Sequence, residues 1–213
     1  MKTTLLTPET DENAVKTAAE LIRAGEVVGM PTETVYGLAA NALNGEAVKK
    51  IFLAKGRPQD NPLIVHIADF DQIYDLCPAV PSQAKLLADA FWPGPLTMIV
   101  PKGECIPDEV SCGLDTVGIR LMARALIRES GVPLAAPSAN TSGRPSTTTA
   151  AHVMHDMDGK IAAVLDGGAC GVGVESTVIT LALERPRLLR PGGITLEQLR
   201  SVLGEVDVDR ALY

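Results

Sequence analysis

Apolar and polar positions in the first part of the chain predict helices and short buried strands. Over residues 11–24 the apolar positions recur every three or four residues, the spacing of an amphipathic helix, and Gly25 then provides a stop. Residues 27–30 form a short apolar run of the kind found in buried strands. A second helix is predicted over residues 48–54, because Gly56 and the proline that follows prevent its continuation.

Similar patterns continue through the rest of the chain. Strands are predicted over residues 63–67, 96–100, 117–121, 134–136, 162–165, 176–183 and 187–189, and helices over residues 81–91, 123–129, 148–157 and 196–203. Because strands and helices do not alternate strictly, we predict an α/β (α+β) domain in which helices pack on an open, twisted, mixed β-sheet. The domain covers residues 1–203, and we expect the acidic tail of residues 204–213 to be loosely held.

Composition narrows the class of protein. A chain of 213 residues with 46% apolar and 3% aromatic residues predicts one domain with an aliphatic core. A net charge of -7 and few aromatic residues argue against broad binding to nucleic-acid backbones. The four cysteines form no C-x-x-C pair, which indicates a reduced, cytoplasmic protein without a structural zinc site. We expect no membrane association, because apolar runs stay far below the ~20 residues that cross a bilayer.

The segment from Lys55 to Pro58 is the first candidate for chemistry. Lys55 and Arg57 stand two positions apart, and Gly56 and Pro58 interrupt the helix, so we expect both cations on a fixed loop. Lysine supplies a point charge and arginine a planar fork of donors, which together suit phosphate or carboxylate oxygens. Taken alone, such a pair is more often a solvated surface turn.

Further polar turns follow several predicted strands or precede them. Each offers hydroxyls, backbone amides or a cation on a chain restrained by proline or glycine, and they comprise residues 31–34, 137–143, 171–177 and 190–193. Singly, each is more often a plain turn. Combined with the Lys55 and Arg57 segment, they favour an anion-binding pocket at the strand ends.

Common catalytic signatures are absent from the sequence. It contains no P-loop, dinucleotide fingerprint or nucleophile elbow. His152 and His155 stand three positions apart on a predicted helix, but a metal site would require more ligands nearby. His66 ends a strand near the cationic segment, where a pocket role and a structural role remain equally open.

Several motifs occur in an order that resembles the YrdC-like family of threonylcarbamoyl-AMP synthases. They are Pro31-Thr-Glu-Thr-Val-Tyr-Gly-Leu38, Lys55-Gly-Arg-Pro58, Asn61-Pro-Leu-Ile-Val-His66, Trp92-Pro-Gly-Pro-Leu-Thr97, Pro137-Ser-Ala-Asn-Thr-Ser-Gly143, Val174-Glu-Ser-Thr177 and Arg190-Pro-Gly192. The resemblance covers residues 12–194. It implies a YrdC-like catalytic domain folded around a large cationic cavity, and a tail that begins the linker of longer family members.

The resemblance also implies a reaction. L-threonine, bicarbonate or CO2, and ATP would give threonylcarbamoyl-AMP and pyrophosphate, with Mg2+ bridging phosphate oxygens. Partner proteins would use the product to modify the adenosine beside the anticodon of certain tRNAs. No protein nucleophile is required, since the threonine amine attacks CO2 and the carbamate oxygen then attacks the α-phosphate.

Site residues follow from the same resemblance, position by position. Those implied to hold L-threonine are Thr34, His66, Arg120, Ala136 and Ser176. Those implied to hold ATP are Arg57, Asn61, Thr116, Ser138, Asn140, Ser146 and Arg190. Lys55 and Arg57 are assigned the catalytic role of offsetting negative charge as pyrophosphate leaves. No side chain is assigned as a metal ligand.

The sequence departs from the family pattern in two places. The segment between Arg120 and the next predicted helix is several residues shorter than usual, and many members continue beyond the position of Tyr213 into a smaller domain. The chain is therefore expected to be a single-domain form or a truncated one. Two alternative functions are a double-stranded RNA or tRNA-binding module that uses the cationic cavity, and a carbamoyl-adenylate-forming carbamoyltransferase domain.

Overall fold

The computed structural model describes residues 2–122 and 125–212. The strands are β1 (Thr4–Leu6), β2 (Val28–Met30), β3 (Gly37–Asn41), β4 (Ile64–Ile67), β5 (Leu96–Pro101), β6 (Thr116–Leu121), β7 (Leu134–Ala135), β8 (Ala163–Leu165), β9 (Thr177–Thr180), β10 (Arg187–Arg190) and β11 (Asp207–Val208). The helices are α1 (Ala14–Arg23), α2 (Gly45–Lys55), α3 (Gln72–Leu76), α4 (Ser82–Phe91), α5 (Asp108–Ser111), α6 (Ala125–Ser130), α7 (Ala150–Met157) and α8 (Leu196–Leu203), followed by a 3-10 turn at Arg210–Leu212.

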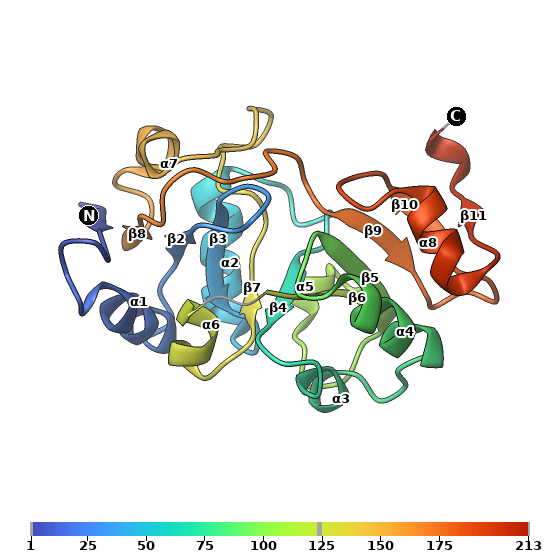
Figure 1. Ribbon diagram of the computed structural model, residues 1–213. Coiled ribbons are helices and arrows are strands. Elements are labelled where there is room, and N and C mark those ends of the chain that lie inside the picture. The colour runs from blue at the N-terminus through green and yellow to red at the C-terminus, as the bar shows by residue number, and fades with distance from the viewer. Residues whose placement is uncertain (1, 123–124, 213) are drawn as a thin grey trace.

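These strands form one mixed sheet, which confirms the predicted fold class (Figure 1). Their order across the sheet is β1-β8-β2-β3-β7-β4-β6-β5-β9-β10-β11. The sheet contains parallel pairs such as β4 with β6 and antiparallel pairs such as β5 with β6. Sequence neighbours are therefore often separated in the sheet, so residues from distant motifs meet at its centre.

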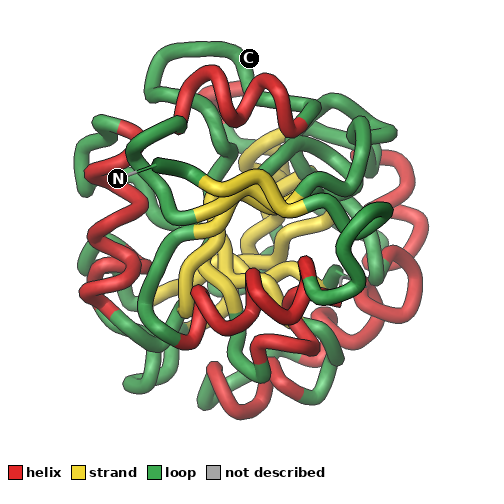
Figure 2. The backbone as a smooth tube through the Cα atoms, turned by 90° about the vertical axis from the view of Figure 1, so that its left-hand side faces the viewer, coloured by secondary structure: helices red, strands yellow, loops and turns green. Residues whose placement is uncertain are grey.

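The sheet separates two apolar cores. Along β3, Leu38 and Ala40 pack into one cluster, whereas Ala39 packs into the other, because successive strand side chains point to opposite faces. Helices α1 and α6 cover the face of Ala39, and α2, α4 and α7 cover the face of Leu38. Figure 2 shows the strands at the centre of the molecule with helices around them.

Helix α2 begins and ends at defined caps. The side chain of Asn44 accepts a hydrogen bond from the amide of Ala47 at the start, and Gly56 adopts a left-handed conformation with φ of 62° at the end. Lys55 is therefore the last residue of the helix. The expectation that Lys55 lies on a loop was wrong, because a glycine cap permits a helix to continue to the residue before it.

Strand β3 and the chain terminus differ from expectation. Residues 37–41 read Gly-Leu-Ala-Ala-Asn, which lacks β-branched residues and alternation, so β3 was not predicted. The acidic tail was expected to be loosely held, but β11 pairs with β10 and Val206 is buried at 3% exposure. Backbone pairing and one apolar anchor thus hold the tail despite its charge.

Other expectations are partly confirmed. The helix predicted over residues 123–129 begins at Ala125, and Ala123 and Arg124, which belong to the shortened segment after Arg120, lie outside the described residues. In the part of the chain that the structure describes, every helix falls short of the length and apolarity needed to cross a bilayer.

Candidate active site

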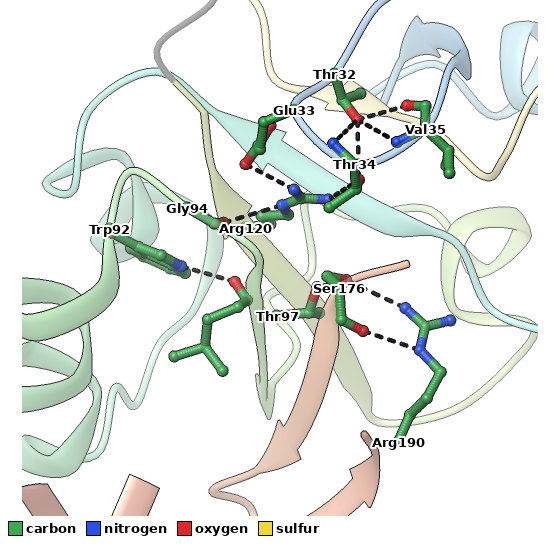
Figure 3. Close-up of polar contacts among 11 residues, drawn as sticks. Thr32, Glu33, Thr34, Val35, Trp92, Gly94, Thr97, Arg120, Ser176 and Arg190 are labelled. Atoms are coloured by element: carbon green, nitrogen blue, oxygen red, sulfur yellow. Dashed lines mark hydrogen bonds and ion pairs between the residues drawn. The ribbon is translucent and has the colours of Figure 1, made fainter. Parts of the chain in front are cut away.

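A hollow of about 160 Å3 lies where β4, β6 and β10 meet the polar turns. It brings together nine of the residues expected to bind L-threonine or ATP. These are Thr34, Arg57, Asn61, His66, Arg120, Ala136, Ser138, Ser176 and Arg190. Three arginines and a neighbouring glutamate, Glu175, give this hollow a strongly charged lining. Figure 3 shows Arg120 on β6 and Arg190 on β10, together with Thr34 and Ser176 from separate loops.

A second hollow, of about 230 Å3, adjoins the first through Arg57, Asn61 and Ser138. Lys55 and Asn140 line only this second space. Ligand pockets commonly enclose about 300–1,000 Å3. The two adjoining hollows together reach the lower part of this range, which neither hollow reaches alone.

Arg120 is a buried residue that lines the first hollow. Strands β4 and β6 pair in parallel with His66 opposite Arg120, so the sheet register places the two side chains together. Arg120 is only 3% exposed. Its Nε donates to the carbonyl of Gly94 (3.1 Å), its Nη1 donates to Oγ1 of Thr34 (3.2 Å), and its Nη2 lies 2.6 Å from the carboxylate of Glu33. The guanidinium is held in one orientation by three segments.

The turn that carries Thr34 is fixed by its own hydroxyls. Oγ1 of Thr32 accepts hydrogen bonds from the amides of Thr34 and Val35, both at 3.1 Å. The two threonine hydroxyls also lie 2.9 Å apart. This local hydroxyl turn directs Thr34 toward Arg120 (Figure 3).

His66 is buried at the wall of the hollow and is neutral at physiological pH. Burial, followed by the charge of Arg120, lowers the pKa of His66 to about 3. Nδ1 lies 3.3 Å from the carbonyl of Leu134, and since a carbonyl only accepts, Nδ1 carries the proton. The ring is thus anchored to β7, and His66 also lines the hollow, so the structural contact is present while its role in ligand binding stays a prediction.

The ammonium group of Lys55 is bonded to backbone carbonyls of the protein. Its Nζ donates to the carbonyl of Asn140 at 2.6 Å and also to the carbonyl of Ser138. The side chain is 2% exposed, and burial together with the charge of Arg57 lowers the pKa of Lys55 to about 8. Lys55 therefore positions the segment of residues 137–143 against the end of α2.

Arg57 is the cation that faces the shared space of the two hollows. Its Nη2 donates to the carbonyl of Asn61 at 2.9 Å, which closes the loop between α2 and β4. Partial burial lowers the pKa of Arg57, whose guanidinium nevertheless stays charged. This geometry fits the expectation that Arg57 contacts an anionic ligand.

Ser176 and Arg190 form the opposite wall. Arg190 donates from Nε to the carbonyl of Ser176 (3.0 Å) and from Nη2 to its hydroxyl (3.1 Å), and its Nη1 pairs with Glu175. The hydroxyl of Ser176 also lies 2.8 Å from that of Thr97. Gly192 allows this arrangement, because a Cβ there would lie 2.5 Å from the amide of Thr177.

Two of the expected ATP residues lie apart from the hollows. Thr116 begins β6, about 13 Å along the strand from Arg120 at ~3.3 Å per residue, and lines neither hollow. Ser146 also lines neither, although its hydroxyl lies 3.3 Å from Glu175. The side-chain Nδ2 of Asn140 donates to the carbonyls of Thr141 and Arg144, and these bonds stabilise the loop that carries Asn140.

Two glutamates of the site were not predicted. Glu33 pairs with Arg120 and Glu175 pairs with Arg190, and both glutamates lie inside the motifs that carry the family resemblance. An acidic residue next to a proposed anion-binding residue was the available signal. Among the described residues, no three His, Cys, Asp or Glu side chains are grouped so that they could hold a metal ion.

The chain is similar to one protein family and to several known proteins. Residues 20–192 match the Sua5/YciO/YrdC family, which carries the description "Telomere recombination". The threonylcarbamoyl-AMP synthase of Bacillus subtilis (strain 168) is 57% identical over 208 residues, covering 95% of this chain and 60% of that protein. The threonylcarbamoyl-AMP synthase of Pyrococcus abyssi (strain GE5 / Orsay) is 53% identical over 207 residues, covering 95% of this chain and 61% of that protein.

A solved structure extends these similarities to three dimensions. The crystal structure of P. abyssi Sua5 complexed with L-threonine superposes with a TM-score of 0.95 at 50% identity, over 100% of this chain and 64% of that one. The chain thus spans about three fifths of the length of these relatives. By sequence and by fold, the chain belongs to the Sua5/YciO/YrdC family.

Proposed function

We propose that this chain is an L-threonylcarbamoyladenylate synthase, which converts L-threonine, bicarbonate or CO2, and ATP into threonylcarbamoyl-AMP and pyrophosphate. The relatives that carry this name, and the L-threonine complex of P. abyssi Sua5, support the proposal. The observation that carries it is the adjacency of two hollows, one ending at the buried Arg120 and the other lined by Lys55 and Arg57.

The first hollow suits an α-amino acid that bears a hydroxyl. The guanidinium of Arg120 would bind the carboxylate, and the Thr34 and Ser176 hydroxyls would hydrogen-bond polar groups of the ligand. Neutral His66 offers an acceptor without adding positive charge. Ala136 contributes a small apolar surface at the same wall. These groups would orient the neutral amine for attack on CO2, with the new N–C bond giving a carbamate as the nitrogen loses a proton to water.

The second hollow suits the triphosphate of ATP. A carbamate oxygen would attack the α-phosphorus, and the bond to pyrophosphate would break. Arg57, which lines both hollows, and Arg190, which faces it from the wall of the first hollow, would then offset the charge that develops on the leaving group. Asn61 and Ser138, which line both hollows, would bind at the junction of the two substrates.

Lys55, Asn140, Thr116 and Ser146 take indirect parts in this proposal. Lys55 and Asn140 would keep the segment of residues 137–143 in place beneath the phosphates. Ser146 would act through Glu175, which it contacts, and Thr116 would act through the position of β6. Bound Mg2+ would neutralise phosphate charge, held chiefly by phosphates and water with Glu175 as the carboxylate within reach.

The product would serve tRNA modification in the cytoplasm. Threonylcarbamoyl-AMP is a mixed anhydride with a good leaving group, so a partner protein would have to transfer its threonylcarbamoyl group to adenosine in tRNA. The net charge of -7 makes direct tRNA binding by this chain a weaker alternative.

Incubation of the chain with labelled bicarbonate, L-threonine, ATP and Mg2+ tests the proposal. We expect pyrophosphate release that requires L-threonine, and a labelled adenylate as product. Release that proceeds with carbamoyl phosphate and without L-threonine would instead indicate a carbamoyltransferase domain. Absence of turnover together with steeply salt-dependent RNA binding would indicate an RNA-binding module.

A further inference from the structure

The buried guanidinium of Arg120 carries an internal carboxylate where the proposed ligand carboxylate would bind. Nη2 of Arg120 lies 2.6 Å from Oε1 of Glu33. Figure 3 shows Glu33 and Thr34 approaching the guanidinium from one turn and Gly94 approaching it from another segment. The subsite therefore holds an ion pair, and an incoming carboxylate meets the guanidinium already paired.

The two members of this pair differ in burial. The side chain of Arg120 is 4% exposed, whereas that of Glu33 is 28% exposed. The backbone of the turn is fixed, since the amides of Val172 and Gly173 donate to the carbonyls of Glu33 and Thr34 at 3.0 Å. The Glu33 carboxylate can consequently move toward solvent by side-chain rotation while the turn and the arginine remain in place.

Electrostatics favours a ligand carboxylate that replaces Glu33 on Arg120 over one that binds Arg120 alongside Glu33. A buried guanidinium without a counter-ion is strongly destabilising, and Glu33 supplies that counter-ion to Arg120. Two carboxylates on one guanidinium repel each other in a poorly solvated site. Once a ligand carboxylate occupies Arg120, Glu33 loses its cationic partner and gains by finding another.

An α-amino acid brings that second cation with it. Its ammonium group is joined to its carboxylate through a single carbon atom, so it arrives beside the position that Glu33 leaves. We propose that Glu33 is an exchangeable counter-ion: the ligand carboxylate replaces it on Arg120, and the released Glu33 accepts hydrogen bonds from the ligand ammonium. Glu33 thereby selects zwitterions. This inference rests on the proposed function, in which Arg120 binds the amino-acid carboxylate.

Calorimetric titration with L-threonine and 3-hydroxybutanoate, the same acid without the amine, tests the exchange. In the wild type, L-threonine is expected to bind much more tightly, because 3-hydroxybutanoate displaces Glu33 and offers it no cation. In Glu33→Gln the affinity ratio is expected to fall by roughly tenfold or more, with 3-hydroxybutanoate binding more tightly and L-threonine more weakly than in the wild type.

Two further variants keep the test decisive. Glu184→Gln removes an exposed carboxylate remote in sequence and should leave the ratio unchanged. Glu33→Asp retains the charge on a shorter arm, so it should lower the ratio less, and it replaces Glu33→Gln if that variant does not fold. An unchanged ratio in both Glu33 variants overturns the exchange alone. Failure of the wild type to bind L-threonine overturns the proposed function as well.

Discussion

The Nζ atom of Lys55 lies 2.6 Å from the backbone carbonyl oxygen of Asn140, a residue 85 positions later in the chain. The amide of Ser142 donates in turn to the carbonyl of Lys55 at 3.0 Å. These bonds join the end of α2 to the segment of residues 137–143. The lysine of the cationic motif therefore shapes the site, while the arginine two positions later faces the ligand space.

Replacing Lys55 should destabilise the fold. Lys55→Met leaves the carbonyls of Ser138 and Asn140 without their donor, so we expect a loss of about 1–3 kcal/mol in the free energy of unfolding. Denaturant titration measures it. The control is Lys50→Met on the same helix, which removes an exposed ion pair with Glu26 and should change stability by at most about 1 kcal/mol. Equal stability of the two variants would contradict this role.

The ammonium of Lys55 should make ATP binding depend on pH. Since burial lowers the pKa of Lys55 to about 8, the free protein loses this positive charge as pH rises through that value. We expect the Kd for ATP to increase between pH 7 and pH 9, and ATP binding near pH 8 to take up protons. Calorimetry in buffers of different ionisation enthalpy measures both effects. Lys55→Met should abolish this dependence, and its persistence there would assign it to another group.

His66 should lower the stability of the protein in acid. The pKa of His66 is about 3 in the folded state and 6.5 in the reference state, so between these values the unfolded chain binds more protons. Stability is thus lost as pH falls below 6.5, with a slope approaching ~1.4 kcal/mol per pH unit. Unfolding at pH 5.0 and 7.0 should show a smaller pH effect in His66→Asn than in wild type. His152→Asn, at an exposed position, is the control; equal pH effects in both would refute the assignment.

Gly192 should be intolerant of a methyl group. In Gly192→Ala the added Cβ would lie 2.5 Å from the amide nitrogen of Thr177 and 2.6 Å from the carbonyl of Glu175, so the backbone next to Ser176 must shift. We expect about 1–3 kcal/mol lower stability and weaker ATP binding, measured by thermal unfolding and calorimetry. Gly171→Ala meets no atom within 4 Å and should behave like wild type. A wild-type response of Gly192→Ala would show that this wall is deformable.

Arg57 should contribute to nucleotide binding without contributing to the amino-acid subsite. Arg57→Ala removes one hydrogen bond to the carbonyl of Asn61 and a charge at the junction of the hollows. We expect ATP affinity to fall by roughly tenfold or more while L-threonine affinity stays the same, because charged hydrogen bonds to phosphate are strong. Separate titrations with each ligand would reveal the difference. A comparable loss of L-threonine affinity would place Arg57 in both subsites.

Much of the fold could be predicted because its signals are local. Apolar spacing and terminal residues predict helices α1, α4, α7 and α8, and each of these signals lies within a few positions along the chain. Strand β3 could not be predicted, because it is buried on both faces and its glycine and alanines carry no strand preference. The pairing of β11 with β10 depends on a neighbouring strand, which an acidic tail does not indicate by itself.

The sequence alone determined the fold class, the family resemblance and most of the residues that line the hollows, since each lies in a compact motif of proline, glycine and hydroxyl residues. Tertiary structure decided what each residue does. Whether Lys55 faces a ligand or holds Ser138 and Asn140 depends on where a segment some 85 positions away returns. Likewise, Glu33 and Glu175 become the counter-ions of Arg120 and Arg190 because the sheet order and the loops bring these residues together in space. Burial and charge act through space, and their effects cannot be derived from spacing along the chain.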